Sequence, residues 1–157
     1  MVKTAIMALL INKRIMFSQF SDFKDILPTV YVCTSLFVAL CVIIEATLLE
    51  KNGGKMPVGR MFMVVSIFST AWTLVSGLAW FFLELELFGS VVAFVYPLYS
   101  ILGLLYSARL MRGVDLPDDP AQIALPIKYL HYCRSFGIVY FALCLVAVFE
   151  LFGRIQI

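Results

Sequence analysis

The chain alternates between long apolar runs and short polar segments. Four runs contain no Asp, Glu, Lys or Arg: residues 27–44, 61–83, 87–108 and 135–149. A helix needs about 20 residues to cross a hydrocarbon core of roughly 30 Å, because each residue adds about 1.5 Å. The pattern therefore predicts four transmembrane helices. Their expected bounds, which include flanking turns, are about 27–49, 61–83, 87–111 and 129–152.

The polar segments between the runs indicate how the helices connect. An Asn-Gly-Gly sequence at 52–54 is a strong turn signal and ends the first spanning helix, which we expect to begin near Pro28. Only residues 84–86 separate the second and third runs, so these helices should form a tight antiparallel hairpin. Pro97 lies inside the third run and predicts a bend, and residues 113–125 form the most polar connection.

Before the first span, residues 2–23 form a shorter, basic segment. It contains Lys3, Lys13 and Arg14 and no acidic residue before Asp22, and its longest apolar stretch is too short to span a bilayer. Most of its apolar side chains fall on one face of a helical wheel. This pattern predicts an amphipathic helix that lies in the membrane interface, and an uncleaved targeting segment is the alternative.

Composition then places the chain among integral membrane proteins. Apolar residues make up 62% of it and charged residues 14%, with a mean hydropathy of +0.99, whereas soluble proteins have about 45–50% and about 25%. We expect one domain without an extramembrane part. A net charge of +2 with scattered basic residues does not point to nucleic acid. The predicted fold is all-α: a four-helix transmembrane bundle with a short N-terminal amphipathic interfacial helix.

The positive charges favour one orientation by a small margin. Five Lys or Arg residues fall on the side of the two termini, and seven fall on the side of the first and third connections. By the positive-inside rule, the two connections face the cytoplasm or matrix. A bacterial or mitochondrial inner membrane is the location that we expect.

Small and hydroxyl-bearing residues recur on one face of the second and third helices. In the second helix they are Ser66, Thr70, Thr73 and Gly77. In the third they are Ser90, Ala93, Pro97, Ser100, Gly103 and Ser107. Because small residues let helix backbones approach closely in lipid, we expect both faces to pack against other helices. An ion pathway is the alternative, but it normally needs an ionisable group at depth, and neither face has one.

Charged residues near the ends of the runs are Glu45, Arg109, Arg134 and Glu150. Long side chains at such positions can reach the membrane interface. Helix direction places Glu45, Arg109 and Arg134 on the same side of the membrane, so we expect interfacial anchoring or an ion pair among them. A proton relay is the weaker alternative, because it would need acids near the bilayer centre.

The segment 128–134 has the most varied chemistry and holds the one histidine of the chain. Tyr129, His131 and Arg134 are candidates for binding a lipid or quinone head group, with an aromatic belt at the interface as the alternative. A lone histidine does not make a metal site, since zinc needs three or four ligands. The four cysteines show no paired spacing and should behave as small hydrophobes. We therefore expect no metal and no intrinsic cofactor, and bound lipid or quinone is the ligand to test for.

No catalytic signature is recognisable in the sequence, which lacks a G-x-S-x-G motif, a phosphate-binding glycine loop and paired carboxylates within a span. We therefore expect a protein that is not an enzyme. The leading hypothesis is a non-catalytic accessory subunit of a larger, energy-transducing (respiratory or photosynthetic) membrane complex, with other membrane subunits and lipids as its partners. The alternatives are a small homo-oligomeric transporter or channel and a tetraspan membrane organiser. Aromatic residues expected to contact a core subunit are Trp72, Trp80, Tyr99 and Tyr106.

Overall fold

Four helices follow one another along the chain in the computed structural model, which describes the backbone of residues 2–57, 59–112 and 123–155 and the side chains from residue 26 to 153 within those ranges. The helices are α1 (Val2–Lys51), α2 (Arg60–Phe82), α3 (Leu87–Leu110) and α4 (Ile127–Ile155). Each contains a stretch that is long and apolar enough to cross a membrane: Ile26–Lys51, Arg60–Phe82, Leu87–Leu110 and Ile127–Gly153. The prediction of an all-α membrane bundle with four spans is confirmed.

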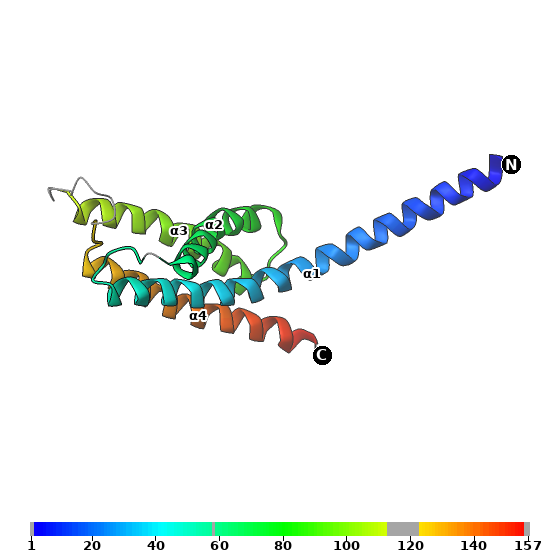
Figure 1. Ribbon diagram of the computed structural model, residues 1–157. Coiled ribbons are helices and arrows are strands. Elements are labelled where there is room, and N and C mark those ends of the chain that lie inside the picture. Colours follow the sequence, from blue (N-terminus) through cyan, green and yellow to red (C-terminus); the bar gives the residue numbers. More distant parts are fainter. Residues whose placement is uncertain (1, 58, 113–122, 156–157) are drawn as a thin grey trace.

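Neighbours in the sequence are also neighbours in the bundle. Each helix packs against the next, and α4 closes the ring against α1, with which it forms the most extensive contact. Figure 1 shows α1 and α4 side by side in opposite directions. The α2–α3 connection is as short as predicted, since α2 ends at Phe82 and α3 begins at Leu87. Short connections between antiparallel helices favour this arrangement.

A glycine permits the close contact between α1 and α4. A Cβ atom added at Gly137 of α4 would lie 2.7 Å from Cγ1 of Ile43 and 3.3 Å from the backbone nitrogen of Ile43 on α1. Helices in lipid associate through such small residues, because the bilayer provides no hydrophobic driving force between them. Buried small residues recur on both helices: Ser35, Ala39 and Ala46 on α1, and Cys144 and Ala147 on α4.

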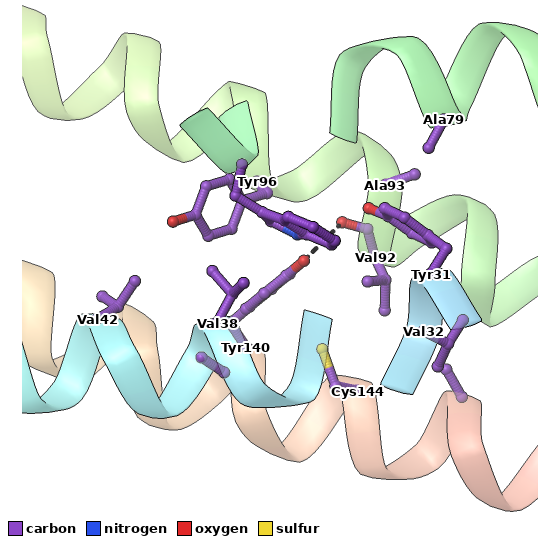
Figure 2. Close-up of a cluster of buried hydrophobic side chains, with 13 residues drawn as sticks. Tyr31, Val32, Val38, Val42, Ala79, Val92, Ala93, Tyr96, Tyr140 and Cys144 are labelled. Atoms are coloured by element: carbon purple, nitrogen blue, oxygen red, sulfur yellow. Dashed lines mark hydrogen bonds between the residues drawn. The ribbon is translucent and has the colours of Figure 1, made fainter. Parts of the chain in front are cut away.

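Aromatic side chains fill the centre of the bundle (Figure 2). Tyr31 stacks on Trp72, with ring centroids 5.6 Å apart, and its hydroxyl donates to Oγ of Ser76 at 3.0 Å. The Tyr140 hydroxyl donates to the carbonyl of Val92 at 3.4 Å, and its ring lies 5.1 Å from that of Tyr96. Hydroxyl groups buried at this depth need such partners, because the hydrocarbon core holds no water to replace them.

The first and third connections meet at one end of the bundle, which we call the loop end. The predicted Asn-Gly-Gly turn is present, and Gly53 and Gly54 have φ angles of 65° and 83°. The amide of Leu125 donates to the carbonyl of Gly54 at 2.9 Å, and an isolated antiparallel bridge joins Lys55 to Ala124. The two connections therefore share one side, as expected. Residues 113–122 of the predicted polar connection lie outside the described residues.

The expected helix start near Pro28 is wrong. Helix α1 runs without interruption from Val2 through Pro28 to Lys51, and its N-terminal part extends past the ends of the other helices (Figure 1). Proline removes one backbone donor, but no turn residue next to it ends the helix, and transmembrane helices tolerate such a loss. The apolar face predicted for residues 2–23 lies outside the described side chains. Helix α3 likewise continues through Pro97.

Candidate functional site

The four helices line an open cavity of about 470 Å³ between the middle of the bundle and the loop end. Its walls are mostly aliphatic and aromatic, and polar groups from all four helices interrupt them. The polar lining residues are Glu45 of α1, Ser69, Thr70 and Thr73 of α2, and Tyr96, Tyr99 and Ser100 of α3, joined by Tyr129 and Cys133 of α4. Small-molecule sites commonly have volumes of about 300–1,000 Å³ and this mixture of apolar walls and few polar groups.

A carboxylate lies in the wall that α1 contributes. Val42, Glu45, Ala46 and Leu49 recur at helical spacing and form that wall. Glu45 lies six residues before the last residue of α1, so about 9 Å of helix separates it from the loop end. It is the one charged residue among those that line the cavity in the described part of the chain. The cavity thus contains the ionisable group that neither polar face of α2 or α3 supplies.

Ser69 holds the carboxylate in place. Its hydroxyl donates to Oε2 of Glu45 at 2.7 Å and is also 3.1 Å from the carbonyl of Ser66. The Tyr96 hydroxyl donates to the carbonyl of Ser69 at 2.9 Å, which ties α3 to the same turn of α2. Ser69 is only 7% exposed, and its contacts with Glu45 and Tyr96 join α1, α2 and α3 and favour one rotation of α2 about its axis.

A second hydroxyl pair joins α2 to α3. The side-chain oxygens of Thr73 and Ser100 are 2.8 Å apart, and the Ser100 hydroxyl is 3.2 Å from the carbonyl of Tyr96. Both residues lie close to the middle of their helices. The pair therefore forms a polar patch at mid-membrane depth, about one helical turn from Ser69 along α2.

The cavity opens sideways between α2 and α3. Among its lining residues, those that are exposed are Thr70, Ala71 and Leu74 of α2 and Leu104 of α3. The lining residues of α1 and α4 are buried or half-buried. A molecule would therefore enter from the face of the bundle that we expect to contact lipid.

The three candidate head-group residues do not converge. Tyr129 lines the cavity, whereas His131 is exposed two residues further along α4, about 200° around the helix. Arg134 is 45% exposed and forms an ion pair with Glu50, with Nη1 and Oε2 2.9 Å apart. Lipid or quinone contact at this end of α4 stays a prediction.

Interfacial anchoring or an ion pair is the expectation for the charged residues near the helix ends, and among the described residues no ion pair joins Glu45 to Arg109 or Arg134. Glu45 accepts a hydrogen bond from Ser69, Arg134 pairs with Glu50, and Arg109 is exposed. Helix direction places these groups on one side of the membrane but does not fix their depth. Glu50 lies more than one turn closer to the loop end than Glu45, and Arg134 pairs with it instead.

The prediction that the small-residue faces pack against other helices holds better for α3 than for α2. On α3 the packing prediction is confirmed for Ala93 and Gly103, which are buried. On α2 it is wrong for Thr70, which is exposed, and for Gly77, where an added Cβ would meet nothing within 4 Å. The buried face of α2 lies one residue earlier, about 100° away around the helix. Its members are Phe62, Ser69, Trp72, Ser76 and Ala79.

Ser69 carries no signal in the sequence that separates it from its neighbours, and nothing in the sequence connects Glu45 with a cavity. The spacing of Ser69, Trp72, Ser76 and Ala79 is as regular as that of the face beside it, so α2 carries two overlapping candidate faces. Two of the aromatic residues expected to contact a partner are used inside the bundle. Trp72 is 8% exposed, and Tyr99 stacks on Phe136 with centroids 3.5 Å apart.

Within the described residues, no group of three or more His, Cys, Asp or Glu side chains is arranged to hold a metal ion. Cys41 and Cys144 are buried, Cys133 is half-buried and Cys33 is exposed. Comparisons with protein-family models, curated proteins and solved structures found no match to this chain.

Proposed function

We propose that this protein is a small membrane carrier that binds an amphipathic molecule inside the bilayer. One observation supports the proposal: a cavity of about 470 Å³ in which a carboxylate and several hydroxyl groups converge within spanning helices. Ionisable side chains at membrane depth are costly and usually serve a function. The transporter alternative of the sequence analysis lacked such a group, and Glu45 of α1 supplies it.

The lining residues divide into two roles. Leu49, Leu74 and Leu104 offer apolar surface to the body of a ligand, and the tyrosines offer aromatic rings. Glu45, together with the Thr73–Ser100 pair, offers hydrogen-bond partners that would fix its orientation. Binding and release, rather than a chemical step, are the task that we assign to this arrangement.

Thr70→Leu tests the proposal at the mouth of the cavity. Leucine there narrows the opening and removes a hydroxyl group, so we expect the affinity for the small molecule to fall about tenfold, a loss of about 1.4 kcal/mol, and the amount retained per protein to fall with it. The free energy of unfolding should change by less than about 0.5 kcal/mol, because Thr70 is exposed. Native mass spectrometry of the protein extracted from its own membrane in mild detergent measures the bound molecule.

The matched control is Val75→Leu, which enlarges an exposed side chain of α2 that does not line the cavity. It should keep the ligand. Wild-type protein that carries no small molecule, or equal loss from both variants, would contradict the carrier proposal. The same spectra report any larger subunit that stays attached.

A second proposal is the accessory subunit of a larger energy-transducing complex. Two observations favour it. The N-terminal part of α1 extends past the rest of the bundle (Figure 1), where a partner would have room to bind. At the end opposite the loop end, Phe81 and Phe82 are 74% and 77% exposed beside Trp80, which packs against Phe81 and Phe94. A partner helix would cover these rings in place of lipid.

Deleting residues 1–21 tests this second proposal. The truncated protein retains all four spans, so its insertion into the membrane should be unchanged, while its incorporation into a complex should fall severalfold. Blue-native electrophoresis of solubilised membranes compares the two quantities in one sample. Normal incorporation of the truncated chain would remove the N-terminal part of α1 from the argument.

A further inference from the structure

We infer that the cavity recognises an organic cation, a substituted ammonium group or a comparable lipophilic cation, through the carboxylate of Glu45. This inference rests on the proposed binding function and names its ligand class. It combines the charge balance of the cavity, the aromatic rings that line it and the position of its mouth.

The charge balance of the cavity is negative. Its lining contains one carboxylate and no Lys, Arg or His among the described residues. The partner that the structure gives to Glu45 is the neutral hydroxyl of Ser69. The nearby cation of Arg134 is already paired with Glu50. A carboxylate among apolar walls is stabilised by a cation of low hydration, so a cationic ligand would complete this site.

The aromatic lining favours the same ligand. Tyr96, Tyr99 and Tyr129 line the cavity together with Glu45. Two of these rings are held in fixed positions: the Tyr96 hydroxyl donates to the Ser69 carbonyl, and the Tyr99 ring stacks on Phe136. Aromatic faces attract organic cations, most strongly where water is excluded. An anion or a strongly hydrated metal ion would gain little from these walls.

The mouth of the cavity selects for a molecule that dissolves in the bilayer. It lies between Thr70 and Leu74 of α2 and Leu104 of α3, on the side that we expect to face lipid. Two sources of the same chemistry would reach it there: a free lipophilic amine or quaternary cation, and the choline head group of a phospholipid. The experiment therefore has to separate these sources.

The probe is tetraphenylphosphonium, and its shape-matched control is the anion tetraphenylborate. Binding to the full-length protein in phosphatidylglycerol nanodiscs is measured by isothermal titration calorimetry, with empty nanodiscs subtracted. We expect the phosphonium to bind at least about tenfold more tightly than the borate. Glu45→Gln should weaken phosphonium binding about tenfold or more, while its amide oxygen can still accept from Ser69. Glu50→Gln, the matched removal of a carboxylate outside the cavity, should change it less than about twofold.

Repeating the titration in phosphatidylcholine nanodiscs separates the two sources. Weaker phosphonium binding to the wild type there, without a change for Glu45→Gln, identifies the choline head group as a competitor for the same site. Unchanged binding identifies a free lipophilic cation.

Two results would overturn the inference. If cation and anion bind equally and Glu45→Gln binds like the wild type, the cavity selects by shape, and the carrier proposal stands without its cationic ligand. If the wild type binds neither probe, the inference fails, and the mass spectrum of the molecule bound to the extracted protein decides the carrier proposal separately. A thermal melt of each variant confirms that it is folded.

Discussion

Gly137→Val should lower the free energy of unfolding by about 1–3 kcal/mol. The added atoms would meet Ile43 of α1, since even a Cβ at this position lies 2.7 Å from Cγ1 of Ile43 and 3.3 Å from its backbone nitrogen. The Ile43 side chain can rotate away, but the backbone of α1 has to move. Because α1 and α4 share the most extensive contact of the bundle, their separation would loosen the whole fold.

Equilibrium unfolding of the detergent-solubilised protein, followed by circular dichroism, measures this loss. The matched control is Gly77→Val on α2, a glycine inside a spanning helix whose added Cβ meets nothing within 4 Å. It should be neutral, or more stable by a few tenths of a kcal/mol because glycine is a poor helix former. Equal effects at the two positions would show that helix propensity, rather than the contact between α1 and α4, accounts for the difference.

Gly54→Val, at the loop end, should lower the free energy of unfolding by at least about 2 kcal/mol. The residue has φ of 83°, a conformation that costs a residue with a side chain about 1–2 kcal/mol. Its Cβ would also overlap the carbonyl oxygen of Leu125, so the hydrogen bond from the Leu125 amide to Gly54 would be strained or lost. Leu125 lines the cavity as well, and the substitution should weaken ligand binding along with stability.

Gly53→Ala separates the two contributions at the loop end. Gly53 also has a positive φ, of 65°, but an added Cβ there has open space around it. The Gly53→Ala variant should lose only the part of the free energy of unfolding that comes from the backbone conformation, about 1 kcal/mol, and its cavity should stay intact. Thermal melts compare the two variants. Similar losses for both would mean that the contact between the two connections adds nothing to stability.

Both substitutions bear on how the site is built. The contact between α1 and α4 provides a closely packed wall, and the joined connections hold the cavity at the loop end. Helix α2 has few buried residues, and its exposed Thr70 and Leu74 form one edge of the mouth. The cavity therefore lies between exposed residues of α2 and the wall that α1 contributes beside its close contact with α4.

The amino-acid sequence alone is enough to identify the spans and their connections. Four apolar runs without a charge, of 15 to 23 residues, can be satisfied only inside a bilayer once their flanking turns are included, and helix length follows from membrane thickness. The turn at 52–54 and the hairpin at 84–86 follow as directly, because glycine with positive φ and a three-residue connection leave few conformations. These features depend on composition and local geometry.

The sequence does not determine the rotation of each helix about its own axis. Only the packing of the helices in the folded bundle decides it. Side chains that face lipid are as apolar as those that face other helices, so the sequence of a spanning helix carries little periodic signal. For that reason the sequence predicts a packing face of α2 at Ser66, Thr70, Thr73 and Gly77. Thr73 does contact Ser100 of α3, but the buried face lies at Ser69 and Ser76. The cavity could not be predicted for the same reason. Glu45 is 24 residues from Ser69, and only the packing of α1 against α2 brings them together.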